Sequence, residues 1–200
     1  YDMQQRIINT AESMFFRFGI RSVTMDDIAK ELGISKKTIY HYFTDKDDLV
    51  EKVTENAMSN QMTKTCMIID ASKNPIEELM FSTKMMREML ENVNVVLFFD
   101  MKKYHPNSWK KYMDFKTVHL EIVKKNLNEG IAQKLYRSDI DVEVMSKLRV
   151  ETIDMAFNME LFPPNLYNIL KVQLESMDHF IRGIVTIKGL EIYEKTRLAI

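Results

Sequence analysis

Two lysines, two tyrosines and a histidine gather in the short stretch from Gly33 to Thr44, which contains no carboxylate. Ammonium and hydroxyl groups bind phosphate oxygens, and side chains of these types also reach base edges and thymine methyl groups. The sequence of 200 residues has a formal net charge of -1, so no field of the whole protein attracts an anion. The chemistry that this stretch favours is therefore a local contact with a phosphate backbone.

Two helix starts close together would position these side chains. Thr24 and Asp27 have the spacing of a capping box, and Ser35 predicts a second helix start soon after it. Only residues 32–34 separate the two predicted helices, and Gly33 supplies the positive φ that such a short connection needs. The sequence therefore predicts a helix-turn-helix between Thr24 and Lys46.

The rest of the chain has the pattern of an all-α protein. Apolar residues recur at spacings of three and four, and Gly and Pro are scarce. We expect breaks at Pro75, Pro106, Gly130 and Pro163-Pro164, with Ser138 or Asp139 capping the penultimate helix. Besides the helix-turn-helix, the expected helices are Met3 to Phe18, Lys46 toward Met67, Ile76 to Leu90, Val93 to Tyr104, Ser108 to Glu129, Asp141 to Asn158 and Asn165 to Thr186, about nine in all.

The composition indicates the cellular compartment in which the protein is expected. No apolar run reaches membrane-spanning length, and no signal-peptide pattern opens the sequence. The single cysteine, Cys66, has no partner for an internal disulfide, which agrees with a reducing compartment. We therefore expect a soluble cytoplasmic protein without a membrane partner.

The N-terminal residues resemble a known family. The run AESMFFRFG and the run TMDDIAKELGISKKTIYHYFTDKDDLV are similar to the tetracycline-repressor (TetR) family in helix-turn-helix spacing, in the T-[IL]-Y-x-[YH]-F core and in the following K-x-x-L. The similarity covers roughly the first quarter of the chain, and the remainder resembles the family only in helical pattern and length. It implies a helix-turn-helix DNA-binding domain over residues 1–47 and a larger helical-bundle ligand-binding and dimerisation domain over residues 48–200. It further implies a homodimeric, ligand-responsive regulator, usually a repressor, on a pseudo-palindromic operator in double-stranded DNA.

The resemblance also assigns roles within the recognition stretch. Tyr40 and Tyr42 are expected at phosphates or thymine methyl groups, and His41 at the edge of the groove. Tyr42 and Phe43 have the alternative of closing the small domain as core residues, and lysines at a helix start are often only solvated surface. The predicted DNA contacts are Thr24, Ser35, Lys36, Lys37, Thr38, Tyr40, His41, Tyr42 and Lys46.

The larger half is rich in methionine and aromatic residues, which suits an adaptable pocket for a small apolar or amphipathic ligand. The alternative is an ordinary bundle core. Polar residues available to orient a ligand are Asn94, Asp100, Tyr104, His119, Asn126 and Asn158, and the sequence leaves open which of them point inward. The predicted pocket residues are Phe81, Met85, Met89, Phe98, Phe99, Met101, Trp109, Tyr112, Met113, His119, Met155 and Met159.

The last two predicted helices are apolar on more than one side, which favours a two-fold four-helix bundle between subunits. The alternative is that such a helix lies at the centre of its own domain. The predicted dimer-interface residues are Met145, Leu148, Ile153, Leu170, Leu174, Met177, Ile181 and Ile184.

Two other classes of protein compete with a DNA-binding regulator. An enzyme would need a catalytic constellation, and the sequence has neither a nucleophile elbow nor a phosphate-binding glycine loop. The histidines His105, His119 and His179 are scattered, so neither a metal site nor a cofactor is expected. The second rival is a helical protein-interaction module that has kept the form of a DNA-binding head without its use.

Overall fold

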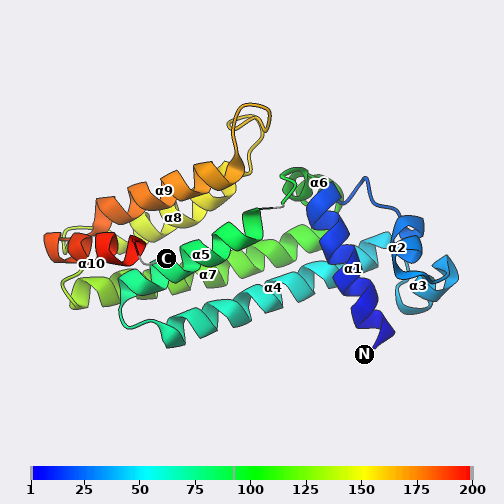
Figure 1. Ribbon diagram of the computed structural model, residues 1–200, viewed down its shortest axis with the longest axis horizontal. Helices are drawn as coiled ribbons and strands as arrows, with labels where there is room; N and C mark the ends of the chain where they lie inside the picture. Colours follow the sequence, from blue (N-terminus) through cyan, green and yellow to red (C-terminus); the bar gives the residue numbers. More distant parts are fainter. Residues whose placement is uncertain (1, 92, 199–200) are drawn as a thin grey trace. The chain divides into compact units, whose positions relative to one another are not determined.

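The computed structural model describes residues 2–91 and 93–198, and it confirms an all-α protein (Figure 1). Within these residues there are ten helices, one more than the sequence indicated. They are α1 (Met3–Phe18), α2 (Met25–Leu32), α3 (Lys36–Tyr42), α4 (Lys46–Ala71), α5 (Pro75–Leu90), α6 (Val96–Tyr104), α7 (Pro106–Ala132), α8 (Val142–Ala156), α9 (Ile169–Ile184) and α10 (Ile187–Arg197).

The chain packs as two compact units, of which the first comprises residues 1–62 and 92–115. Its centre is the apolar face of α1, where Ile7, Ala11 and Phe15 are almost fully buried at the spacing of a helical stripe. Ile28 of α2 and Ile39 of α3 close the same core. The first unit, which we call the head, therefore holds the helix-turn-helix against one side of α1.

The second unit comprises residues 63–91 and 116–200. Ile76 of α5, Leu127 of α7 and Ile181 of α9 have no exposed surface and form the centre of its core. A buried polar link stabilises the same region, because the Asn126 amide donates to the Pro75 carbonyl at 3.0 Å and accepts from the Tyr136 hydroxyl at 3.0 Å. The sequence analysis named Asn126 as a residue that could orient a ligand. In the structure its side-chain amide is instead hydrogen-bonded within the core.

Helices α4 and α7 each contribute residues to both units, since the boundaries fall after Met62 and after Phe115. The packing units therefore differ from the domains inferred by resemblance, which divide the chain once, at residue 47. The resemblance divides the chain into a DNA-binding part and a ligand-binding part, and that functional division stays a prediction. By packing, α6 and the first part of α7 belong with the helix-turn-helix.

Several predicted helix ends are wrong for local reasons. Gly130 lies inside α7 rather than ending it, and the Tyr136 ring occupies the space where a Cβ atom would stand, which is why the position is a glycine. Asp141, and not Ser138 or Asp139, caps α8 by accepting from the Val144 N–H at 3.1 Å. Helix α9 starts at Ile169, well after the predicted Asn165, because Asn168 caps it.

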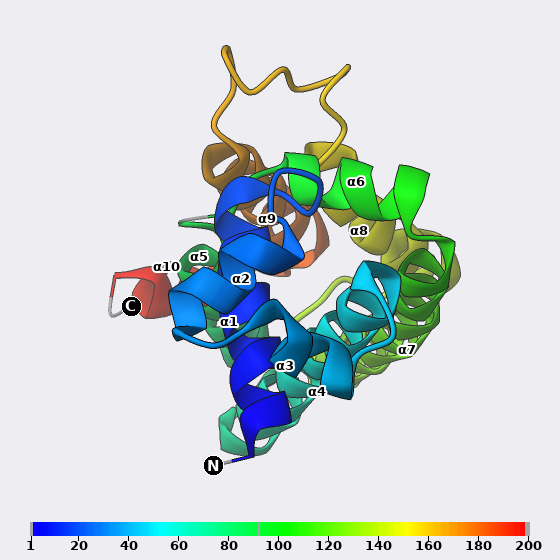
Figure 2. The ribbon, with the colours of Figure 1, turned by 90° about the vertical axis from the view of Figure 1, so that its right-hand side faces the viewer.

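The additional helix, α10, follows directly from α9. Thr186 caps it by accepting from the Gly189 N–H at 3.1 Å, so the residue predicted to end one helix instead begins another. Between α8 and α9, residues 157–168 form a connection that extends beyond the ends of both helices in two perpendicular views (Figure 1 and Figure 2).

Candidate nucleic-acid interface

The turn between α2 and α3 has the geometry that the sequence predicted. The Thr24 hydroxyl accepts from the Asp27 N–H at 3.1 Å and the Asp27 carboxylate accepts from the Thr24 N–H at 2.8 Å, which confirms the capping box. Gly33 has a left-handed conformation with φ of 66°, and the Ile34 N–H donates to the Ala29 carbonyl at 3.0 Å. The direction of α3 is therefore set by local hydrogen bonds.

Helix α3 has one buried and one exposed face. Ser35 caps it by accepting from the Thr38 N–H at 3.1 Å, while Ile39 and Phe43 are 0% and 1% exposed in the core of the first unit. Phe43 is therefore a core residue. Of the two alternatives for Tyr42, the structure supports the surface one, because its side chain is 36% exposed.

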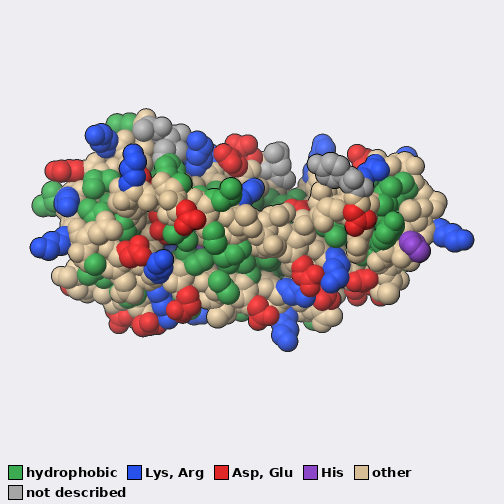
Figure 3. All heavy atoms as spheres, turned by 90° about the horizontal axis from the view of Figure 1, so that it is seen from below, with side chains coloured by type: hydrophobic (Ala, Val, Ile, Leu, Met, Phe, Trp, Pro, Cys, Tyr) green, Lys and Arg blue, Asp and Glu red, His purple; other side chains and the backbone are tan. Residues whose placement is uncertain are grey.

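The exposed face of α3 carries the predicted contact residues. Lys36, Lys37, Tyr40 and His41 are all exposed, and Tyr40 retains 46% of its surface. The structure therefore brings these four side chains together with Tyr42 on the accessible side of the helix. Figure 2 looks onto α2 and α3, and Figure 3 shows basic and histidine side chains standing out at the same end of the first unit.

The two lysines of α3 differ in their electrostatic surroundings. Lys36 donates to the Asp26 carboxylate at 2.7 Å, and this neighbour raises the pKa of Lys36. Among the described residues, Lys37 makes no ion pair. Because both lysines are exposed, water screens the Lys36 pair and its contribution to stability is small. The Lys37 ammonium is consequently exposed without an ion-pair partner among the described residues, and its contact with DNA stays a prediction.

Lys46 is placed differently from the expectation that it grips a phosphate. Its ammonium donates to the Ile20 carbonyl at 2.6 Å, and the side chain is half-buried. Burial lowers the pKa of Lys46 because water is excluded from the ammonium group. In this conformation Lys46 ties the start of α4 to the turn after α1, and it faces the interior of the first unit.

Residues of α6 and α7 brace this unit in a way that the sequence did not reveal. The Asp100 carboxylate, 3% exposed, accepts from the Arg21 N–H at 2.9 Å in the turn between α1 and α2. Lys111 of α7 lies 3.1 Å from Glu51 and 2.5 Å from Glu55 on α4. These partners are distant in sequence, so no local pattern identifies them. Asp100 is therefore a structural residue of the head, and not a side chain free to orient a ligand.

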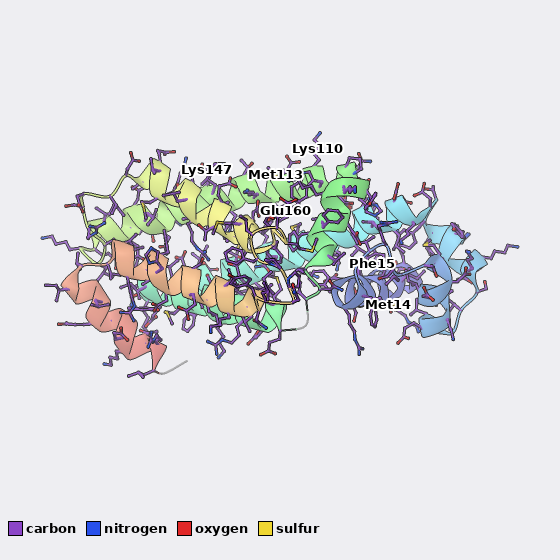
Figure 4. All side chains as sticks on the ribbon, turned by 90° about the horizontal axis from the view of Figure 1, so that it is seen from above. Met14, Phe15, Lys110, Met113, Lys147 and Glu160 are labelled. Atoms are coloured by element: carbon purple, nitrogen blue, oxygen red, sulfur yellow. The ribbon has the colours of Figure 1, made fainter. Side chains whose placement is uncertain are left out.

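The predicted pocket residues divide equally between the two units. In the first unit, Tyr112 is 7% exposed and its ring centroid lies 5.4 Å from Phe98 and 5.2 Å from Trp109. Tyr112 and Met101 thus form part of the core of the head. Phe99 and Met113, the latter labelled on α7 in Figure 4, are exposed.

The second unit holds the other half of the predicted pocket set. Phe81, Met85, His119 and Met159 are half-buried, while Met89 and Met155 are exposed. Burial and the positive charge of Arg149 lower the pKa of His119 to about 4, so its imidazole is neutral at physiological pH. The role of these residues in binding a ligand stays a prediction.

The predicted dimer residues also separate into two groups. Met177, Ile181 and Ile184 are between 0% and 4% exposed within their own subunit, so the structure corrects their assignment and makes them core residues. Leu148 is 54% exposed, while the others are half-buried, namely Met145, Ile153, Leu170 and Leu174. Exposed apolar side chains also lie along α8, where Val144, Leu148 and Met155 are all at least 40% exposed.

Residues 2–91 and 93–198 contain neither a metal-binding cluster nor a membrane-spanning helix. No group of three or more His, Cys, Asp or Glu side chains in this range has an arrangement that would hold a metal ion. In the same range, no helix combines the length and the hydropathy needed to cross a membrane.

Comparisons with known proteins agree with the geometry of the head. The profile of the family described as bacterial regulatory proteins, tetR family, matches residues 7–53, which include α1, α2 and α3 from Ile7 onward. The uncharacterized HTH-type transcriptional regulator YvaF of Bacillus subtilis (strain 168) is 29% identical over 183 residues, which cover 91% of this chain and 95% of YvaF.

A named repressor is similar to this chain in sequence, and a regulator solved with its ligand is similar in structure. The HTH-type transcriptional repressor KstR2 of Mycobacterium tuberculosis (strain ATCC 25618 / H37Rv) is 25% identical over 73% of this chain and 75% of its own length. A crystal structure of the regulator FadR from Bacillus subtilis in complex with stearoyl-CoA has 20% identity and a TM-score of 0.69, over 90% of this chain and 98% of FadR. The exposed recognition helix, the family profile and the similar regulators lead to one conclusion: residues 7–53 form a DNA-binding domain of the tetR family, and the chain is a DNA-binding transcriptional regulator.

Proposed function

We propose that this regulator is a ligand-responsive homodimeric repressor that binds a pseudo-palindromic operator through the helix from Ser35 to Tyr42. The observation that supports this proposal most directly is the two-faced structure of α3. Its apolar side is fixed in the core by Ile39 and Phe43, and its opposite side offers lysine, histidine and tyrosine side chains to solvent. A helix held in this way enters a major groove without rearranging the head.

Individual contacts follow from the exposure of the side chains. Lys37 and His41 are proposed to reach base edges, and Tyr40 and Tyr42 to contact phosphates or thymine methyl groups. Lys36 contributes a phosphate contact, with Asp26 limiting its free charge. Thr24, Ser35 and Thr38 present hydroxyl groups near the flanking backbone. Because α3 contains no arginine, part of the sequence preference is proposed to come from DNA shape.

The homodimer is proposed to form through the exposed side of α8. Val144, Leu148 and Met155 recur at intervals of four and seven residues, which places them along one face of the helix. The connection after α8 adds Leu161 and Leu166, which are 55% and 74% exposed. Burying such apolar surface against a second copy removes it from water and places two recognition helices on one operator.

The effector is proposed to be a small apolar or amphipathic molecule bound by the second unit. Two relatives support this class: the solved FadR structure contains stearoyl-CoA, and the solved KstR2 structure is described as that of a ketosteroid transcriptional regulator. Helix α4 starts beside the recognition helix at Lys46 and continues to Ala71 in the second unit, so it provides a continuous path for a signal. Release requires only that the ligand bind the released geometry more tightly than the operator-bound one.

Operator binding tests the proposal. A duplex selected from a random library should bind the protein with an affinity that falls steeply between about 50 and 200 mM salt, as phosphate contacts require. Fluorescence anisotropy on the labelled duplex measures this dependence, and a scrambled duplex is the matched control. Half-sites separated by about one or two turns of DNA are expected. Equal affinity for the selected and scrambled duplexes, or no enrichment during selection, would refute the proposed function.

A further inference from the structure

The seam between α8 and α9 in the second unit encloses two polar side chains, Arg149 and Gln173. Arg149 is 5% exposed and Gln173 has no exposed surface. The Gln173 amide donates to the Ile153 carbonyl at 2.8 Å, one turn beyond Arg149 on α8. The Arg149 guanidinium carbon lies 5.8 Å from the centroid of the Phe180 ring, two turns beyond Gln173 on α9. Both polar side chains therefore enter the same seam from facing helices.

Neither side chain is fully satisfied by the rest of the chain. Arg149 Nη1 and Gln173 Oε1 are buried and have no hydrogen-bond partner among the residues that the structure describes. The acidic side chains that follow on α8, Glu151 and Asp154, both pair with Lys116 of α7. The carboxylates of this region are thus directed to a different cation. Among the described residues, the electrostatic neighbours of the Arg149 guanidinium are the face of the Phe180 ring and the imidazole of His119.

The surroundings of the Arg149 guanidinium also leave its positive charge without a negative partner. Burial lowers the pKa of Arg149 to about 10, so the group is still charged at physiological pH although water is excluded from it. The imidazole of His119, on α7, is close enough for the Arg149 charge to lower its pKa, and it is neutral. One uncompensated positive charge consequently remains in the interior of the second unit.

A charge in this position is unusual because folded proteins normally pair a buried charge within the chain. A methionine of similar length would fill the same space without the desolvation penalty. The retained guanidinium points instead to a partner that is not part of the chain. Its planar fork matches a carboxylate, and a single positive charge balances a single negative one.

We propose that Arg149 and Gln173 form the recognition point for the carboxylate of an apolar organic acid. Arg149 binds the carboxylate, and Gln173 Oε1 accepts from a hydroxyl group or a water molecule beside it. Apolar and aromatic side chains flank the point, with Phe180 9% and Met177 4% exposed, so the remainder of the acid is apolar. The inference rests on the proposed function in one respect, since it makes this acid the effector.

Calorimetric titration of the purified full chain with sodium decanoate tests the site. The titration uses a buffer without carboxylates and decanoate below its micellar range. The neutral 1-decanol serves as the probe without a charge, and sodium acetate and sodium chloride serve as small anions at equal ionic strength. We expect decanoate to bind at least tenfold more tightly than decanol, and the small anions to bind more weakly than decanoate.

Variants locate the binding point. Arg149→Met should lower decanoate affinity at least tenfold and leave decanol binding unchanged, whereas Arg149→Lys, which keeps the charge, should retain part of the preference for decanoate. Lys147→Met is the matched control, because Lys147 is an exposed cation on the same helix (Figure 4). Circular dichroism confirms that each variant is folded.

Three results would overturn the inference: wild-type decanoate affinity in Arg149→Met, loss of the preference in Lys147→Met, or acetate and chloride binding as tightly as decanoate. The operator assay, carried out without any acid, remains an independent measurement. Operator binding with no binding of decanoate would remove the acid site and leave the proposed repressor standing. Decanoate binding that depends on Arg149, in a protein that binds no operator, would support the site and refute the repressor.

Discussion

Replacing Arg149 with methionine should make the ligand-free protein more stable. The fold lowers the pKa of this guanidinium well below its ordinary range, to about 10, because burial excludes water from the charged group. Because each tenfold change in proton affinity corresponds to about 1.4 kcal/mol, keeping the group charged costs the folded state about 3 kcal/mol. The sign follows from the lowered pKa: the penalty is present at every pH below about 10 and disappears only in strongly basic solution.

The net gain is smaller than this penalty, because the variant also loses the contact between the guanidinium and the Phe180 ring, which contributes on the order of 1 kcal/mol. Methionine keeps most of the aliphatic packing, so we expect Arg149→Met to gain about 1 to 2 kcal/mol, or roughly 2 to 8 °C in Tm. Thermal melts followed by circular dichroism, at one protein concentration and without carboxylates, measure the difference.

Lys147→Met is the control for removing a positive charge from α8, and it should change stability by less than about 0.5 kcal/mol because Lys147 is exposed. A loss of stability of 1 kcal/mol or more in Arg149→Met would refute the reasoning. It would show that the guanidinium has a compensating partner in the folded chain. In that case neither the penalty nor the proposed carboxylate site would have a basis.

Three further outcomes are expected. Lys37→Ala should weaken operator binding by about 1 to 3 kcal/mol if the side chain reads a base, whereas Lys30→Ala on α2 should have little effect in the same anisotropy assay. Lowering the pH from about 6.5 to about 4 should cost up to about 3 kcal/mol at His119, because its pKa is lowered in the fold and the unfolded chain takes up the proton first. Denaturant titrations across this range should show a shallower pH dependence in His119→Gln, and identical slopes would contradict the assignment. Gly130→Ala should lower Tm, since its Cβ would lie 1.9 Å from a ring atom of the buried Tyr136; an unchanged melt would show that the ring can move.

Local rules explain the parts of the fold that the sequence predicted well. The caps at Thr24 and Ser35 and the turn at Gly33 involve residues within a few positions of one another, so the amino acids alone specify them. The ends of α7 and α9 were predicted less well, because they also depend on residues outside the helices. Gly130 lies inside α7 as a glycine that makes room for the Tyr136 ring, and a contact between a helix and the segment after it has no periodic signature.

The same distinction applies to the functional residues. The exposed side of α3 was predictable because a helix-turn-helix assigns its faces by spacing. Arg149 was not, since an isolated arginine on an amphipathic helix is usually a surface residue, and only the packing of α9 against α8 reveals that it is buried. For Lys46 the sequence could not show the tertiary contact either: its ammonium donates to the Ile20 carbonyl, and its contact with DNA stays a prediction.

The bracing of the head by Asp100 has a consequence for engineering regulators with new specificities. The turn after α1 is held by a carboxylate 79 positions away in sequence, and the packing unit of the head is built from two separate stretches of chain. A chimera joined at a single crossover near residue 47 would therefore leave the Arg21 N–H without its acceptor and remove α6 from the core. Recoding the exposed residues of α3 within the intact chain avoids this mismatch, and it is the route by which a new operator preference should be installed.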